Sequence, residues 1–128
     1  MKTTQLTLNL DSKPGVLAKL ARVLADAGVN ITGLFAAEAA GRGRLRLLVS
    51  DVARAKAALT AAKYRPGEEA VVSLTLEDRP GELARVADQL AQAKINIRFA
   101  YATTGGQGRC TLVLGVGNAD KAQQVLGG

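Results

Sequence analysis

Apolar and polar residues alternate in two short stretches of the chain, one near its beginning and one near its middle. In residues 6–10 three leucines alternate with threonine and asparagine, and residues 72–76 repeat the pattern. A period of two predicts strands with one buried face. After each strand and a short polar turn, apolar residues return at the three- and four-residue spacing of an amphipathic helix. These helical positions are Leu17, Leu20, Leu24 and Ala27, and then Leu83, Val86, Leu90 and Ala93.

The two stretches belong to an internal repeat. Residues 6–36 recur as residues 72–102, and 13 of the 31 aligned positions are identical. The shared positions include a Pro-Gly pair before each helix and an Asn-Ile pair after it. A repeated supersecondary unit is therefore the organising feature of this chain.

Each copy continues in the same order after its first helix. Second strands are expected from Asn30 and from Asn96, with Ile31 and Phe35 on one face and, in the other copy, Ile97, Phe99 and Tyr101 on one face. Glycine-rich links then lead to third strands at residues 44–49 and 110–116. Second helices are expected at residues 51–63 and 118–126, each with a polar capping candidate, Asp51 or Asn118, before an Ala-rich run.

The order of elements predicts an α+β fold made of two ferredoxin-like βαββαβ repeats, with antiparallel sheets that carry helices on one face. We place the first domain at residues 1–68 and the second at residues 69–128. A last strand of the first copy is expected within residues 64–70. The second copy stops straight after its second helix, so its last strand is expected to be missing, and the chain is either truncated or leaves that edge empty. A vacant edge would favour pairing between chains, in a homodimer.

The turn between the first strand and the first helix carries the most distinctive chemistry. The opening N–H groups of a helix lack internal partners and can bind a carboxylate. Gly15 and Gly81 let a small ligand approach the backbone closely, and Asp11 or Asp78 could accept hydrogen bonds from an ammonium group. Both ends of a free amino acid would then be bound. The alternative is that an acidic or serine side chain only caps the helix, with Pro14 and Pro80 in its first turn.

Asn30 and Asn96 are the second candidate feature. Each begins a strand, where its side-chain amide can bind a ligand or cap the neighbouring backbone. The residues alone leave both interpretations open.

Composition narrows the possible functions. The chain has a formal net charge of +6, one cysteine and no histidine, so the commonest general base and metal ligand is missing. We find no acid cluster, no Cys–base pair and no phosphate-binding loop, because the glycines of residues 105–108 precede a strand. We therefore expect no enzyme, no metal and no cofactor. A lone Cys110 and the lack of an apolar leader or membrane span predict a cytoplasmic protein.

The repeated pattern resembles the ACT domain, twice, over nearly the whole chain. It consists of an apolar strand, an acidic residue before Pro-Gly, a leucine-rich helix, and Val-Asn-Ile or Ile-Asn-Ile. The tandem layout is similar to that of small stand-alone double-ACT proteins of bacteria. The resemblance implies a regulatory module that senses an amino acid and acts on an enzyme of amino-acid metabolism. Coupling of this kind is typically ~1–3 kcal/mol.

In that family the effector lies where two ACT units meet, and it contacts the turn of one unit and the second-strand start of the other. The resemblance implies two sets of ligand-binding residues. The first is Asp11, Ser12, Lys13, Pro14, Gly15, Val16, Leu17, Asn30 and Ile31; the second is Glu77, Asp78, Arg79, Pro80, Gly81, Glu82, Leu83, Asn96 and Ile97.

The two copies depart from the family pattern in different ways. Some amino-acid-binding members have asparagine where this chain has Ser12 and Asp78. Asp78 would repel a carboxylate, and Glu82 adds a second negative charge. We therefore expect the first copy to make the carboxylate contacts.

Two other functions remain open from the sequence. One is a structural or oligomerisation module that has lost its ligand site. The other is RNA binding, because ferredoxin-like sheets also occur in RNA-recognition domains and the chain is basic. The aromatic-rich consensus of those domains is absent, since the chain has four aromatic residues in all. The expected partners are a free amino acid, an amino-acid biosynthetic enzyme and a second copy of the chain, with no membrane and no nucleic acid.

Overall fold

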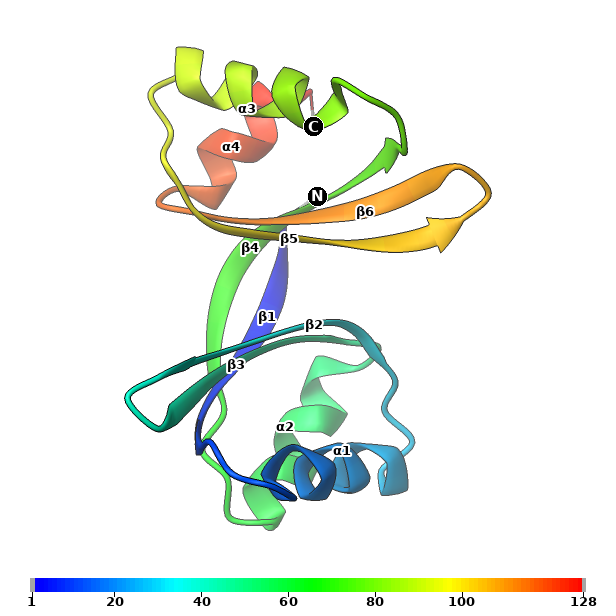
Figure 1. Cartoon of the computed structure of the whole chain (residues 1–128), viewed down its shortest axis with the longest axis vertical. Coiled ribbons are helices and arrows are strands. Elements are labelled where there is room, and N and C mark those ends of the chain that lie inside the picture. The colour runs from blue at the N-terminus through cyan, green and yellow to red at the C-terminus, as the bar shows by residue number, and fades with distance from the viewer. Residues whose placement is uncertain (1, 128) are drawn as a thin grey trace. The chain divides into compact units, whose positions relative to one another are not determined.

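The computed structural model describes residues 2–127, which form four helices and six strands (Figure 1). The first five elements are β1 (Lys2–Asp11), α1 (Val16–Asp26), β2 (Ile31–Ala39), β3 (Arg42–Val49) and α2 (Val52–Ala61). The other five are β4 (Gly67–Glu77), α3 (Glu82–Gln92), β5 (Ile97–Gly106), β6 (Arg109–Val116) and α4 (Ala119–Val125). The predicted order of strands and helices is confirmed. No helix in the described part of the chain has the length and apolar character needed to cross a bilayer.

The chain forms two compact units, which we describe one at a time. The first unit is Thr4–Glu69, and the second contains the described residues from Ala70 onward together with Lys2 and Thr3. Strands β1 and β4 each contribute residues to both units, because β1 begins in the second and β4 begins in the first.

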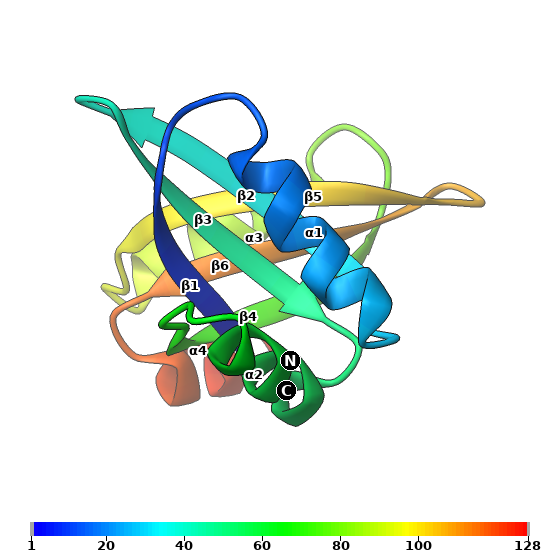
Figure 2. The same cartoon turned by 90° about the horizontal axis from the view of Figure 1, so that it is seen from below.

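In the first unit the strand order is β2-β3-β1, followed by the first residues of β4. Strand β3 runs antiparallel to both β1 and β2, and Leu6 and Leu8 of β1 lie opposite Leu47 and Leu45 of β3. Helices α1 and α2 lie on the same side of these strands (Figure 2). Between sheet and helices lies a core made of Leu6, Leu8, Leu20, Leu24, Val29, Leu45, Leu47, Ala55 and Leu59.

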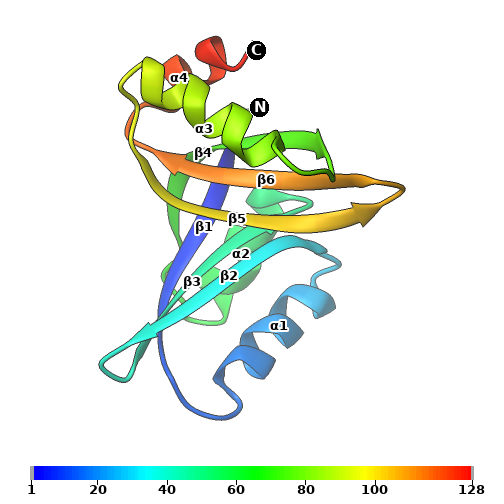
Figure 3. The same ribbon diagram turned by 45° about the horizontal axis from the view of Figure 1, so that its top comes forward.

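The second unit repeats this arrangement. Its strand order is β5-β6-β4, with Lys2 and Thr3 of β1 beside β4, and β6 runs antiparallel to both of its neighbours. Helices α3 and α4 cover one face (Figure 3). The core consists of Val72, Leu74, Leu76, Val86, Leu90, Ile95, Leu112, Leu114, Val116, Ala119 and Ala122. The predicted ferredoxin-like fold, with helices on one face of antiparallel strands, is thus confirmed for both repeats.

Strand β4 is continuous from Gly67 to Glu77. The last strand expected for the first copy and the opening strand of the second copy are therefore one strand, because no turn-forming residue separates them. Its beginning is held in the first unit by Glu69, whose carboxylate accepts from the buried Gln5 amide at 2.8 Å and from Arg46 Nε at 3.1 Å.

The edge beside β4 in the second unit is not left empty. The described residues after α4 form no strand, and the start of β1 lies at that edge. The Lys2 main-chain N–H donates to Gln123 Oε1 at 2.6 Å, and the Lys2 ammonium group binds Asp120 at 3.0 Å. Each unit therefore completes its sheet with residues from the strand that opens the other repeat.

The second helix of each unit begins at a polar residue that caps it. The predicted caps are confirmed, since Asp51 accepts from the Arg54 N–H and Asn118 from the Lys121 N–H, both at 3.0 Å.

The prediction that each second strand keeps its apolar residues on one face is wrong. Ile31 packs against the helix-side core.

A register shift explains this difference in both second strands. It lies between Ile31 and Gly33 in β2, and between Ile97 and Phe99 in β5. A one-residue shift moves every following side chain to the other face. Phe35, Phe99 and the residues that alternate with them therefore lie on the face away from the helices.

We predict that Gly115→Ala destabilises the second unit. Phe99 lies opposite Gly115, and a Cβ atom at position 115 would clash with Phe99 Cε2. Overpacking of this kind costs about 1–3 kcal/mol, which a urea unfolding curve would measure. Gly117→Ala is the matched control, since its Cβ would meet no atom within 4 Å. Equal stability of the two variants would contradict this account of the packing.

Candidate functional site

Both strand-to-helix corners are built on a glycine in the left-handed conformation. Gly15 has φ 87° and ψ −16°, and Gly81 has φ 92° and ψ −13°. Only glycine adopts this region without a steric cost. The helix starts one residue later in each case, so Pro14 and Pro80 lie before the helix cap. Their predicted placement in the first helical turn is wrong, because the glycine interrupts the helical dihedral angles.

Each corner is fixed to the hairpin of its own unit by one main-chain hydrogen bond. The Ser12 N–H donates to the Gly41 carbonyl at 3.0 Å, and the Asp78 N–H donates to the Gly108 carbonyl at 2.8 Å. The residue before each of these is paired with the first residue of the third strand, Asp11 with Arg42 in the first unit. The backbone of the two corners is therefore held in the same way.

The first turn of α1 exposes N–H groups that the protein does not use. The Val16 N–H makes a long bond of 3.4 Å to the Lys13 carbonyl, and the regular helical ladder starts with Lys19 donating to Gly15 at 3.0 Å. The intervening N–H groups, of Leu17 and Ala18, have no acceptor among the residues described. No side chain caps this helix, so the capping interpretation of Asp11 and Ser12 is wrong.

The start of α3 has the same backbone pattern. The Glu82 N–H is 3.5 Å from the Arg79 carbonyl, and the Arg85 N–H donates to Gly81 at 3.0 Å. The N–H groups of Leu83 and Ala84 likewise have no acceptor within the described part of the chain, and no side chain caps the helix.

A cavity of about 150 Å³ lies at the first corner. A cavity of about that volume in a protein interior can hold a molecule the size of benzene. It is lined by Leu10, Asp11, Ser12, Lys13, Val16, Leu17, Ala36, Gly43, Arg44 and Leu45. Leu17 is 44% exposed, although its helical spacing predicted a core position. It lines this cavity and is not part of the buried core of the unit.

The charges around this cavity are predominantly positive. Asp11 accepts from Arg42 through Oδ1 at 2.5 Å. Lys13 and Arg44 line the cavity, and neither forms an ion pair with any described residue. Together with the unpaired helix N–H groups, they favour a ligand with a negative group at this corner.

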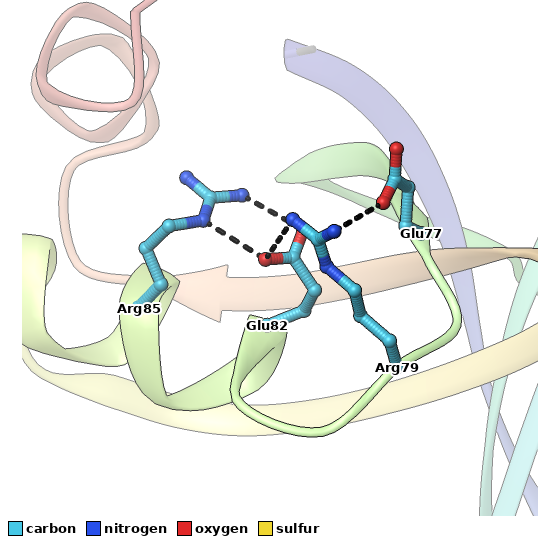
Figure 4. A network of polar contacts seen from close by, with 4 residues as sticks. All are labelled: Glu77, Arg79, Glu82 and Arg85. Carbon is cyan, nitrogen blue, oxygen red and sulfur yellow. Dashed lines mark hydrogen bonds and ion pairs between the residues drawn. The ribbon is translucent and has the colours of Figure 1, made fainter.

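The second corner carries its own negative charges (Figure 4). Arg79 lies between two carboxylates, with Glu77 at 2.9 Å and Glu82 at 3.8 Å. Arg85 donates to Glu82 through Nε at 3.2 Å and through its terminal nitrogen at 3.3 Å. The hydrogen bond from Arg85, more than the charges of Arg85 and Arg79, lowers the pKa of Glu82. An ionised carboxylate thus stands at the start of α3, where α1 has Val16.

The structure places the repeated Asn-Ile pairs away from the corners of their own units. Asn30 follows α1, so the length of this helix, 11 residues or ~16 Å, separates it from Gly15. The Asn30 N–H donates to Ser50 Oγ and the Ser50 N–H donates to the Asn30 carbonyl, both at 2.9 Å. Ile31 and Ile97 pack against the two cores.

The sequence interpretation missed the residues that strand β3 and strand β2 bring to the first cavity. Gly43, Arg44 and Leu45 come from β3, and Ala36 comes from β2. Strand pairing could have indicated them, since a ferredoxin-like order sets the third strand beside the first. Among the described residues, no group of three or more His, Cys, Asp or Glu could hold a metal ion.

Comparison with known proteins identifies the family. The family model of the ACT domain pair matches residues 1–127. The chain belongs to the ACT domain pair family. No curated protein sequence matches it.

Solved structures agree with this assignment. A protein of Bacteroides thetaiotaomicron is 32% identical, with 98% of this chain and 87% of that chain covered and a TM-score of 0.92. The ligand-free regulatory subunit of aspartate kinase from Thermus thermophilus is 20% identical, with 96% and 89% covered and a TM-score of 0.67. The corresponding subunit from Thermus flavus is 15% identical, with 98% and 93% covered and a TM-score of 0.66. The two aspartate kinase subunits share the fold of this ACT domain pair.

We predict that Arg85→Gln raises the pKa of Glu82, measured by NMR titration of its carboxyl carbon. Because the folded-state pKa is lowered, ionised Glu82 stabilises the fold above its unfolded-state pKa, and this contribution is lost as the pH falls through the folded-state pKa. The variant should therefore lose part of the acid-side pH dependence of stability. Arg22→Gln removes the same charge from α1 and is the control; an equal rise of the Glu82 pKa in that variant would contradict the role of Arg85.

Proposed function

We propose that this ACT domain pair is a regulatory module that binds a free amino acid at its first corner. The observation that carries the proposal is the cavity beside the unpaired N–H groups of Leu17 and Ala18. Membership of the ACT family supports a regulatory role, and the fold shared with aspartate kinase regulatory subunits is consistent with it.

The carboxylate of the ligand would accept hydrogen bonds from the free N–H groups at the start of α1. A carboxylate at this position satisfies donors that otherwise face solvent, and it interacts favourably with the positive end of the helix dipole. Gly15 leaves the approach open, because a Cβ atom there would meet no atom within 4 Å. Lys13 adds a positive charge to the lining of the cavity.

The ammonium group of the ligand would bind Asp11. This carboxylate is shared with Arg42, which uses only Oδ1. A carboxylate has about four lone-pair sites, so Oδ2 retains the capacity to accept from an ammonium group. The two charged ends of an amino acid would then both be bound by the Asp11–Leu17 segment.

The side chain of the ligand would lie against the apolar part of the cavity. Leu10, Val16, Leu17, Ala36 and Leu45 supply this surface. Because the cavity of about 150 Å³ has to take the whole amino acid and not only its side chain, it favours small aliphatic amino acids over large aromatic ones.

The second corner would bind a ligand carboxylate less well. Ionised Glu82 occupies the first position of α3 and repels a second carboxylate. We therefore propose that the amino acid binds at the first corner. The residues from Glu77 to Leu83 at the second corner would mainly stabilise the second unit.

The bound amino acid would act on an enzyme of amino-acid metabolism, and the chain itself would carry out no reaction. Ligand binding would shift the stability of the first unit, and a partner enzyme would respond to that shift. The proposal also includes a homo-oligomer as the acting form and a cytoplasmic location. A structural module without a ligand is the alternative that the next experiment distinguishes.

We predict that a small aliphatic amino acid at millimolar concentration raises the melting temperature of the wild-type chain and that Val16→Glu reduces the rise. The substitution introduces the residue found at the same position of the second corner, where a glutamate is compatible with a helix start. Like-charge repulsion should weaken binding about tenfold or more, measured by calorimetric titration.

The reciprocal change Glu82→Val is the matched control and should leave this affinity unchanged. A wild-type chain that none of the common amino acids stabilises would support the purely structural module. If Glu82→Val lowered the affinity and Val16→Glu did not, the amino acid would bind at the second corner, and the proposed site at the first corner would be wrong.

A further inference from the structure

The second unit has a strongly basic cavity at the end opposite its corner. It has a volume of about 390 Å³ and is lined by Lys94, Ile95, Asn96, Arg98, Gly117, Asn118 and Lys121. These residues come from the link between α3 and β5, the start of β5, the link between β6 and α4, and the start of α4. The volume lies in the range of small-molecule sites, which is about 300–1,000 Å³.

Three cations line this cavity without a carboxylate. Neither Lys94, Arg98 nor Lys121 forms an ion pair with a described residue. Asp120 precedes Lys121 in the chain, but its carboxylate is engaged by Lys2 at 3.0 Å, and it does not line the cavity. Like charges gathered without a counter-ion repel one another, and an anion removes this repulsion.

The polar groups of the cavity are also suited to an anion. Arg98 donates to the Val116 carbonyl at 3.1 Å, which positions its guanidinium while other donors stay free. Asn118 uses Oδ1 to accept from the Lys121 N–H, which leaves its NH₂ group as a donor. The cavity thus offers hydrogen-bond donors beside its three positive charges.

The first repeat shows that the fold does not require these charges. At the positions that correspond to Lys94, Arg98 and Asn118 it has Gly28, Thr32 and Asp51. Lys121 corresponds to Arg54, which forms an ion pair with Asp51 at 3.9 Å. The corresponding residues of the first unit therefore have no net charge, whereas those of the second carry three positive charges.

We propose that this cavity binds a small molecule that carries a phosphate group. A phosphate has three acceptor oxygens and up to two negative charges, which matches several cations and amide donors better than a single carboxylate does. The site is separate from the amino-acid site proposed at the first corner, and each stands without the other.

The test uses the full chain and calorimetric titration with orthophosphate, pyrophosphate and ATP in chloride buffer of low ionic strength. We expect saturable binding of at least one probe, weakened by added salt. Binding of pyrophosphate and ATP alike indicates recognition of the phosphate groups themselves, and binding of ATP alone indicates a nucleotide ligand. Both results support the proposal. Failure of all three probes to bind overturns the proposal. A single-stranded oligonucleotide is titrated as a fourth probe, and binding of the oligonucleotide alone also overturns it.

Variants copied from the first repeat locate the site. Arg98→Thr and Lys94→Gly each remove one cation and should weaken binding about tenfold. Lys94 has φ 59°, a conformation that glycine adopts readily, so this variant should fold. Asn118→Asp keeps a capping side chain and should weaken binding at least as much, because it adds a negative charge.

Lys63→Gly is the matched control. Lys63 also has a positive φ, 70°, follows α2, and does not line this cavity. The variant loses the same charge from the same backbone conformation and should bind the probe as the wild type does. An equal loss of affinity in Lys63→Gly would mean that net charge alone attracts the phosphate, and the proposal would be wrong. Amino-acid binding should be unchanged in all four variants.

Discussion

The left-handed glycine that precedes the first helix of each repeat is the constraint on which this structure depends. It turns the chain from strand to helix within four residues and begins the helix without a side-chain cap. The cost of an uncapped helix start is that N–H groups are left without acceptors. At Gly15 these groups stand beside a cavity with an apolar surface and two unpaired cations, and this combination is what makes the corner a candidate ligand site.

Duplication gives this chain an internal comparison. The two corners have nearly the same backbone angles and the same hydrogen bond to the neighbouring hairpin. They differ in side chains, because Val16 and Glu82 stand at the same position of the two helices. The opposite ends of the units differ as well, since Asp51 of the first unit neutralises a cation and Asn118 of the second does not. The shared backbone preserves the fold, and charge differences distinguish the surfaces.

Local sequence patterns were sufficient for the element order and for the caps. Alternation marked the opening strands, and the polar residues Asp51 and Asn118 marked the starts of the second helices. The contact between Glu82 and Arg85 was also accessible from the sequence, since residues three apart are neighbours on a helix. Each of these features depends on residues that are close together along the chain.

The remaining features depend on residues that are far apart in the sequence. A register shift in β2 and β5 moved the aromatic residues to the other face, and nothing in the alternation marks it. The start of β1 completes the sheet of the second unit, which no local pattern indicates. The β2 and β3 residues that line the first cavity, such as Ala36 and Arg44, follow only from strand pairing. The residues of a site that is formed by several strands could therefore be identified only from the structure.

The central claim is that the free N–H groups at the start of α1 hold the carboxylate of an amino acid. The most direct measurement is the amide NMR spectrum of the chain during titration with L-valine, L-leucine and L-isoleucine in turn. We expect the chemical shifts of the Leu17 and Ala18 amides to change, and the change to saturate, with at least one of these amino acids. The chemical shifts of the Leu83 and Ala84 amides should not change. Unchanged Leu17 and Ala18 resonances throughout, or larger changes at Leu83 and Ala84, would contradict it.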